Sequence, residues 1–267
     1  MASTRPRNAR NPRKSANRVG SAPSAARRAE HPKAVAFFDF DNTIIHGDAG
    51  PLFGRALYGQ RRSQRKRIGR FFLFLRHIPY ISAMATQAFL YKLHARRRSS
   101  IVRSAYKGLR GLDAREFYGA MGQFVDEKVV PRIYLDVAER IRRHVAEGTA
   151  CVIITTGMEP LVEHCVKHMP APMTVIGCHL LERKGKLTGR VEGPLFGVDK
   201  ANILKAYCKA LGVDPKACWA YSDHWSDKHM LDAVGHGVAV NPRGPLLRMA
   251  RLKGWEILEP KAPNAAD

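Results

Sequence analysis

The segment Val-Ala-Phe-Phe-Asp-Phe at residues 35–40 constrains the fold of this chain more than any other part of the sequence. An unbroken apolar run of this length is typical of a strand that is buried on both faces of a parallel sheet. A second such run, at residues 150–154, predicts a second buried strand. Further strands are predicted at 173–179, 217–221 and 236–240, with hairpin-like material at 180–191.

Helices are predicted between these strands. Residues 134–147 have apolar side chains at helical spacing, and Gly148 follows at the position typical of a helix C-cap. Further helices are predicted at 159–167, 199–211, 227–234 and 244–252. Strands that alternate with helices predict an α/β fold, with a Rossmann-like parallel sheet covered by helices on both faces.

Residues 51–131 interrupt this alternation directly after the first strand. They are rich in Leu, Ala, Arg and Phe and contain few runs of β-branched residues, which predicts helices. We therefore expect a helical cap at 51–131, inserted into an α/β core formed by 34–50 and 132–267. Residues 1–33 are predicted to be a disordered basic tail, with an organelle transit peptide as the alternative.

Basic residues are concentrated in two segments of this 267-residue chain, whose formal net charge is +22 at pH 7. Residues 1–33 contain nine Lys or Arg and one acidic residue, and residues 49–112 contain fifteen Lys or Arg and no acidic residue. These two segments account for the basic excess, so an anionic partner should meet them first.

The five cysteines are scattered and include no Cys-x-x-Cys pair. This pattern argues against a zinc site or a disulfide framework and for a reducing compartment. The N-terminus lacks the apolar segment of a secretory signal. We therefore expect a cytoplasmic protein, with peripheral contact at the inner membrane face as the alternative.

Four groups of polar residues stand at the predicted carboxyl ends of strands or in the turns just beyond them. They contain Asp39 and Asp41, Thr155, Lys200, and Asp223 and Asp227. Each group alone is weak evidence, because such residues usually serve as caps or solvated charges. However, open parallel sheets bind their ligands at the carboxyl ends of strands. The shared placement of all four groups therefore predicts a single site.

These residue types suit phosphoryl transfer. A carboxylate nucleophile can form an acyl phosphate and so divide hydrolysis into two steps. A second carboxylate, two residues further along, can protonate the leaving oxygen and later deprotonate water. Because carboxylates repel an anionic substrate, a cation is needed, and Mg²⁺ prefers oxygen ligands of this kind. A hydroxyl and a Lys supply fixed donors to the transferring oxygens.

The same residues resemble a known family, the phosphatases of the haloacid dehalogenase (HAD) superfamily. The resemblance rests on four motifs: Asp39-x-Asp-x-Thr43, Thr155-Thr-Gly, Lys200 and Asp223-x-x-x-Asp227. The longer segments that resemble its phosphoserine-phosphatase-like branch, subfamily IB, lie at 155–162, 221–231 and 234–242. A helical cap between the first two motifs is typical of that branch. The resemblance therefore implies the HAD fold and an enzyme that hydrolyses phosphoric monoesters.

The resemblance also implies roles for the carboxylates. Asp39 would be the nucleophile and a Mg²⁺ ligand. Asp41 would be the general acid and base, with its backbone carbonyl on the metal. Asp223 would be the third protein ligand, and Asp227 would support the metal site and orient Lys200.

Thr155 and Lys200 are the phosphate-binding residues that the resemblance implies. Thr155 stands where many family members have Ser, so the hydroxyl is kept. His224 and Trp225 stand where small residues are common in the family. The two rings either pack within their own loop or contact the substrate.

The sequence leaves the substrate open between a small phosphorylated molecule and a lipid-linked phosphate. The apolar residues 71–91, which Arg residues interrupt and flank, predict the buried face of a cap bundle or, alternatively, an interfacial element on anionic lipid. The second interpretation favours a lipid phosphate such as lysophosphatidate or phosphatidylglycerophosphate. Phosphoserine is the competing substrate, although residues 49–112 offer no acidic group to its ammonium.

A basic nucleic-acid-binding protein with a secondary phosphatase site is the alternative from another functional class. Residues 1–33 lack the regular aromatic residues of a base-stacking surface. Binding would therefore rest on phosphate contacts and depend steeply on salt. Nucleic acid is the less favoured partner for this reason.

Overall fold

The computed structural model describes residues 32–63, 103, 106–194 and 197–263 of the chain. The predicted basic tail at 1–33 and the basic apolar stretch at 71–91 lie almost wholly outside the described residues. The division into core and cap therefore stays a prediction.

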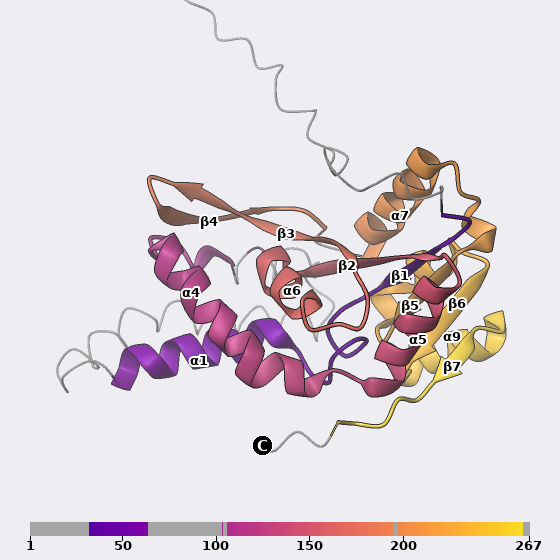
Figure 1. The fold of residues 1–267 in the computed structure, drawn as a ribbon, viewed down its shortest axis with the longest axis horizontal. Coiled ribbons are helices and arrows are strands. Elements are labelled where there is room, and N and C mark those ends of the chain that lie inside the picture. Colours follow the sequence, from indigo (N-terminus) through magenta and orange to yellow (C-terminus); the bar gives the residue numbers. More distant parts are fainter. Residues whose placement is uncertain (1–31, 64–102, 104–105, 195–196, 264–267) are drawn as a thin grey trace, which may run out of the picture. The chain divides into compact units, whose positions relative to one another are not determined.

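A seven-stranded sheet forms the centre of the described structure (Figure 1). Its strands are β1 (Val35–Phe38), β2 (Ala150–Met158), β3 (Thr174–Arg183), β4 (Lys186–Glu192), β5 (Trp219–Ser222), β6 (His236–Val240) and β7 (Glu256–Leu258). Their order across the sheet is β4-β3-β2-β1-β5-β6-β7, and every neighbouring pair is parallel except β3 with β4. The predicted α/β fold with a largely parallel sheet is confirmed.

Strand β1 lies in the middle of the sheet. Val35 is in register with Ala150 of β2, and Ala36 with Trp219 of β5. The order of the strands changes direction at β1, and such a switch point is where open α/β sheets bind their ligands. The residues that follow β1, β2 and β5 are therefore brought to the same edge.

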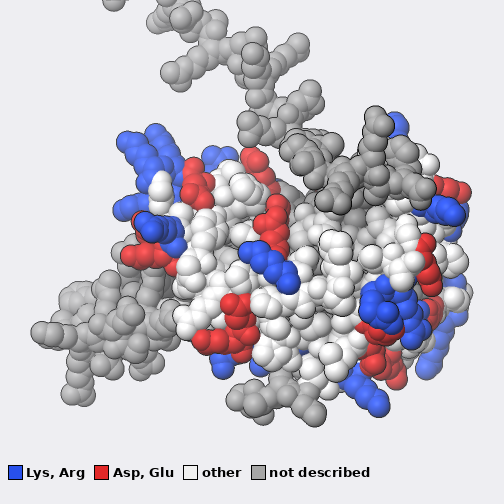
Figure 2. Space-filling model, in the orientation of Figure 1, with Lys and Arg blue, Asp and Glu red and all other residues white. Residues whose placement is uncertain are grey.

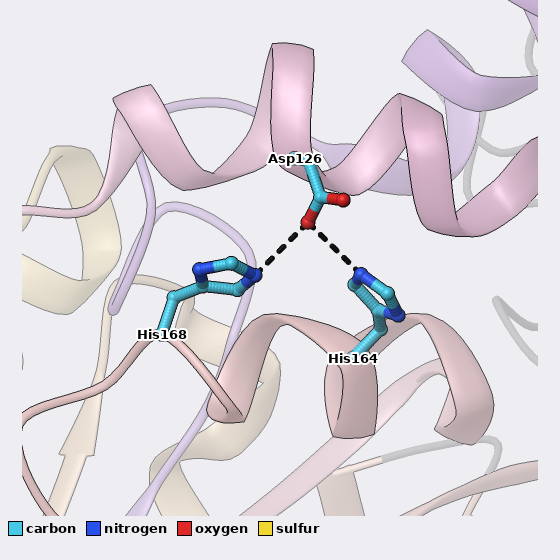
Figure 3. Close-up of side chains that lie close together, drawn as sticks. All are labelled: Asp126, His164 and His168. Carbon is cyan, nitrogen blue, oxygen red and sulfur yellow. Dashed lines mark hydrogen bonds and ion pairs between the residues drawn. The ribbon is translucent and has the colours of Figure 1, made fainter.

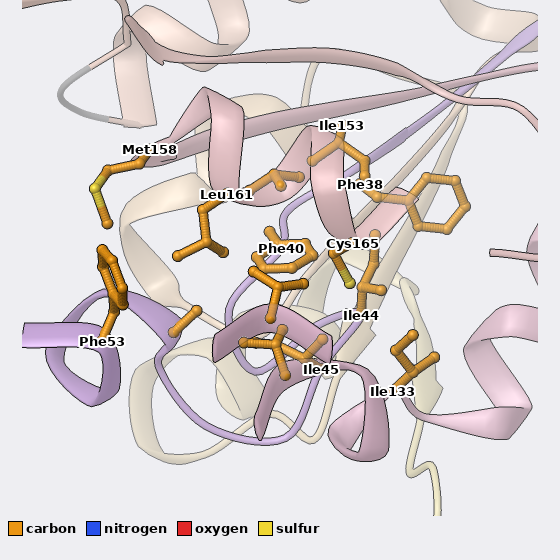
Figure 4. Close-up of a cluster of buried hydrophobic side chains, with 14 of the residues drawn as sticks. Phe38, Phe40, Ile44, Ile45, Phe53, Ile133, Ile153, Met158, Leu161 and Cys165 are labelled. Atoms are coloured by element: carbon orange, nitrogen blue, oxygen red, sulfur yellow. The ribbon is translucent and has the colours of Figure 1, made fainter. Parts of the chain in front are cut away.

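Helices cover both faces of the sheet, and successive residues of β1 point to opposite faces and so contribute to different cores. Phe38 belongs to a core formed with α5 (Leu135–Ala146) and α6 (Glu159–Val166), part of which Figure 4 shows. Phe37 belongs to a second core, on the other face. The helices of that face are α7 (Gly197–Leu211), α8 (Lys228–Leu231) and α9 (Gly244–Lys253).

Residues of the predicted cap form two described helices, α1 (Ala49–Ser63) and α4 (Ala114–Phe124). Phe53 of α1 packs against Phe117 and Phe124 of α4, with ring centroids 5.3 Å and 5.0 Å apart. Asp113 caps α4 by accepting a hydrogen bond from the Glu116 backbone N–H at 3.1 Å. The chain then passes through the π-helical segment Val125–Val129 and the 3₁₀ turn Val130–Arg132 to reach α5.

Charged side chains of both signs are interspersed over the described surface that Figure 2 shows. The described charged residues therefore form no continuous patch of one sign on this face. No helix within the described ranges is long and apolar enough to span a bilayer.

Candidate active site

Asp39 follows directly on β1, at the carboxyl edge of the sheet. Its backbone N–H donates to the Tyr221 carbonyl at 2.9 Å, which extends the pairing of β1 with β5. Its Oδ1 accepts a hydrogen bond from the Phe40 backbone N–H at 2.7 Å. The backbone of both strands therefore fixes the position of this carboxylate.

Lys200 joins two carboxylates at the base of the site. It lies in the first turn of α7, and its Nζ is 2.7 Å from Asp39 Oδ1 and 2.7 Å from Asp227 Oδ2. Ser222 Oγ also donates to Asp227 Oδ2, at 3.0 Å. Lys200 is buried, with 2% of its surface exposed, so its ammonium is held in place by these two carboxylates.

The opposite charges of Lys200 and Asp227 in this cluster stabilise each other's ionised forms. Burial alone would lower the pKa of Lys200, but the neighbouring Asp227 and Asp39 carboxylates raise it overall. Burial alone would raise the pKa of Asp227, and the Lys200 ammonium lowers it overall. Lys200 and Asp227 are therefore both ionised near neutral pH.

Gly197 allows α7 to approach the loop that carries Asp227. A Cβ atom at position 197 would lie 1.8 Å from the Ser226 carbonyl oxygen, which is far closer than atoms can approach. Only glycine fits here, three residues before Lys200. The close packing of α7 on this loop places the Lys200 ammonium beside Asp227.

Asp223 faces Thr43, which belongs to the loop after β1. The Asp223 backbone N–H donates to Thr43 Oγ1 at 3.1 Å, and the same hydroxyl is 3.5 Å from Asp223 Oδ1. Thr43 is fully buried. It therefore ties the loop after β5 to the loop after β1.

Asp41 and Thr155 both lie close to Gly157. A Cβ atom at position 157 would be 3.2 Å from Thr155 Oγ1 and 3.9 Å from Asp41 Oδ2. Asp41 Oδ1 accepts a hydrogen bond from the Ala49 backbone N–H at 2.9 Å, in the first turn of α1. The first two sequence motifs therefore meet at the end of β2.

Three carboxyl groups of the site have raised pKa values. Burial raises the pKa of Asp39 to about 6, against the opposing effect of Lys200. Burial raises the pKa of Asp41 to about 7, although the Ala49 N–H partly offsets this. Burial, together with the charges of Asp39 and Asp227, raises the pKa of Asp223 to about 8. Burial is the largest cause of all three shifts, and neighbouring carboxylates add to each of them.

This donor set fits a hard divalent cation. The carboxylates converge in a largely buried site, and one ammonium does not balance them. Oxygen ligands with excess negative charge are what Mg²⁺ prefers. The residues present are therefore compatible with the Mg²⁺ that the sequence predicts.

All six predicted site residues thus lie in one region of the described structure. Sequence reasoning assigned no role to Thr43 and Ser222, which connect the two loops and hold Asp227. Thr43 ends the first predicted motif and Ser222 directly precedes Asp223, so their positions close to predicted site residues were the available signal.

His224 and Trp225 occupy the loop between Asp223 and Asp227. Ser226 donates its backbone N–H to His224 Nδ1 at 3.0 Å, so the His224 ring caps a turn of its own loop. Trp225 is 42% exposed, and Lys228 Nζ lies 4.3 Å from its ring centroid. These contacts support loop packing for His224.

A family model for haloacid dehalogenase-like hydrolases matches residues 36–232, which is most of the chain and includes every predicted site residue. The chain belongs to the haloacid dehalogenase-like hydrolase family. The expected family and a hydrolase activity are therefore confirmed.

Relatives and solved structures agree with this family. A Mycobacterium tuberculosis protein named phosphoserine phosphatase is 28% identical over 225 residues, covering 84% of this chain and 70% of its own length. A Bordetella pertussis protein of unknown function has a TM-score of 0.68 at 20% identity, covering 85% of this chain and 99% of its own. A substrate-bound phosphoserine phosphatase structure has a TM-score of 0.61 at 18% identity, covering 86% and 94%. The two structures support the HAD fold.

Proposed function

We propose that this chain is a Mg²⁺-dependent phosphomonoester hydrolase in which Asp39 accepts the phosphoryl group. The observation that carries the proposal is the position of the Lys200 ammonium, 2.7 Å from both Asp39 and Asp227 at the switch point of the sheet. This arrangement holds a carboxylate and a cation together where a phosphate would enter. The phosphatase names of relatives support the same class of substrate.

In the first step, Asp39 attacks the phosphorus atom and the leaving oxygen departs. Lys200 and Thr155 would bind the phosphoryl oxygens and keep the group in line with the Asp39 carboxylate. Water then attacks the aspartyl phosphate, releasing inorganic phosphate and restoring Asp39.

Asp41 would move the proton in both steps. Its raised pKa of about 7 supports this role, because the Asp41 side chain is protonated in a sizeable fraction of the molecules near neutral pH. The protonated form gives its proton to the leaving alkoxide, and the ionised form then removes one from the attacking water. The hydrogen bond that the Ala49 backbone N–H donates to Asp41 Oδ1 orients the carboxyl group.

Asp39, the Asp41 backbone carbonyl and Asp223 would hold Mg²⁺, with Asp227 in support. When bound, the ion neutralises negative charge and polarises the phosphoryl oxygens. We expect a chelator to abolish hydrolysis and added Mg²⁺ to restore it.

Substitution of the nucleophile tests this proposal. The full-length Asp39→Asn protein should lose hydrolysis of an aryl phosphate, because an amide cannot form the acyl phosphate. Asp232→Asn is a matched control, since Asp232 forms an exposed ion pair with Lys253 at 3.0 Å, away from the predicted site residues. Full activity of Asp39→Asn would overturn the mechanism.

Phosphoserine is the substrate that the relatives favour, and a lipid-linked phosphate is the one that the basic apolar cap sequence favours. A screen across amino-acid, sugar, nucleotide and lipid phosphates, with and without residues 1–33, would distinguish them. Binding to anionic liposomes and a DNA gel shift at moderate salt would test the membrane and nucleic-acid alternatives directly.

A further inference from the structure

A second group of ionisable side chains converges in the described structure and includes none of the predicted catalytic residues. Asp126, His164 and His168 point toward one another in Figure 3. His164 Nε2 and His168 Nε2 each lie 2.9 Å from Asp126 Oδ1, and the three atoms all lie within 4.8 Å of one another. Each residue thus offers one atom of a type that binds metals.

His164 lies in the last turn of α6, and His168 follows just after the helix ends. Beyond Val166 the chain continues as turns, with the His168 backbone N–H donating to Cys165 at 3.0 Å. His164 and His168 are therefore one helical turn apart and share a face, the spacing that allows two imidazoles to bind one ion.

Asp126 comes from the facing π-helical segment Val125–Val129, and π-helical turns are frequent at functional sites. Just before this segment, Gly122 leaves room for an imidazole. A Cβ atom at position 122 would lie 3.2 Å from His164 Cε1. The backbone of this segment is thus close enough for Asp126 to meet both histidines.

We propose that Asp126, His164 and His168 form a binding site for a divalent transition-metal ion, for which Zn²⁺ is the best match. Two imidazole nitrogens and one carboxylate oxygen suit Zn²⁺ better than Mg²⁺. Zinc ligands about 2.0–2.2 Å from the ion stand about 3–3.5 Å from one another, so small side-chain shifts would admit it. The scattered cysteines predict that the chain has no zinc site, and the proposed site differs from that expectation because it uses His and Asp ligands and no cysteine.

Exposure and charge also suit an ion with open coordination positions. The side chains of His164, His168 and Asp126 are 29%, 40% and 50% exposed, so water can complete the coordination shell. Asp126 would bind the ion as a carboxylate, which is the form that a metal binds.

The bound ion would stabilise the packing of two segments of the fold against each other. It would connect the segment after α4 to α6, and α6 begins just after the Thr155-Thr-Gly motif. The site shares no residue with the proposed catalytic site, and the proposal does not depend on Asp39 chemistry.

Titration of the full-length, chelator-treated protein with Zn²⁺, in excess Mg²⁺, tests this site. Calorimetry should detect a Zn²⁺ site in the unaltered chain whose Kd rises at least tenfold in each of His164→Gln, His168→Gln and Asp126→Asn. Zn²⁺ should also raise the Tm of the unaltered chain more than the Tm of any variant. The substitutions keep hydrogen-bonding side chains at partly exposed positions, and circular dichroism would confirm folding.

His179→Gln is the matched control, because His179 is exposed on β3 and lies outside the cluster. It should bind Zn²⁺ as the unaltered chain does. Equal Zn²⁺ affinity in the unaltered chain and the three cluster variants would overturn the proposal, as would equal Zn²⁺-induced changes in Tm. Because the three substitutions are made separately, one that prevents folding leaves two that decide the question.

Discussion

The Lys200 ammonium and the Asp39 carboxylate form a largely buried ion pair, with Nζ 2.7 Å from Oδ1. The same ammonium is equally close to Asp227, so one cation sits between two carboxylates from different strand ends. A buried charge that loses its partner is strongly destabilising. The stability of the fold and the geometry of the proposed nucleophile therefore depend on the same side chain.

Replacement of this cation should affect activity and stability together. In Lys200→Met, we expect kcat/KM for an aryl phosphate to fall by about 10²–10³, because a fixed donor to the phosphoryl group is lost. The free energy of unfolding should fall by about 3–5 kcal/mol, because Asp39 and Asp227 lose their buried partner. Steady-state kinetics and urea denaturation measure the two effects. Unchanged stability would contradict the structural account of this pair.

Asp41→Asn should discriminate between leaving groups. An alkyl phosphate needs a proton on its leaving oxygen, so its kcat should fall by about 10²–10⁴. A nitrophenyl phosphate leaves without that proton, and its first step should be much less affected. The ratio of the two single-turnover rates is the measurement. An equal loss for both substrates would argue against Asp41 as the general acid.

Gly197 should not tolerate a side chain. We expect Gly197→Ala to lower the free energy of unfolding by at least about 1–3 kcal/mol, because a Cβ atom would overlap the Ser226 carbonyl. Gly119→Ala is the matched control in an exposed part of α4, where a Cβ atom meets nothing within 4 Å. That change should stabilise the fold by about 0.5–1 kcal/mol. The same sign of effect in both variants would be inconsistent with the packing of α7.

His144 should make stability depend on pH. Burial contributes most to a pKa below the ordinary 6.5, with Glu147 and Glu256 opposing it and Arg140 assisting it. Its Nε2 lies 2.8 Å from the Tyr221 hydroxyl oxygen. As the pH falls below 6.5, the unfolded chain binds a proton before the folded chain does, so stability is full above this pH and is lost below it.

Thermal denaturation of the unaltered chain and His144→Gln at about pH 8 and about pH 5.5 checks this expectation. The Tm of the unaltered chain should fall more over this interval than that of the variant. A parallel decrease in both proteins would show that His144 does not contribute.

Much of the sheet was predictable because its strands are short apolar runs. The predicted strand at 236–240 matches β6, and the predicted helix at 199–211 begins two residues after the observed start of α7. Strand β7 was missed, because Glu256–Leu258 is too short for a periodic pattern and forms by pairing with β6. Gly148 has the positive φ, 77°, expected of the predicted helix C-cap.

Residues that meet at the ends of neighbouring strands were easier to assign to one site than residues that meet through the packing of helices. Asp39 and Lys200 could be assigned to one site from their positions at the predicted carboxyl ends. Asp126 and His164 are 38 positions apart and meet only because α6 packs beside the segment after α4. No local pattern in the sequence predicts such a contact.

Whether Asp39 carries the phosphoryl group is tested most directly by trapping the intermediate. The full-length protein with Mg²⁺ and substrate would be quenched in acid during turnover and treated with borohydride, which reduces an aspartyl phosphate to homoserine. Mass spectrometry should find homoserine at position 39, only when substrate is present and not in Asp39→Asn. Substrate-dependent modification at another residue, or rapid turnover with no modification at Asp39, would contradict the proposed mechanism.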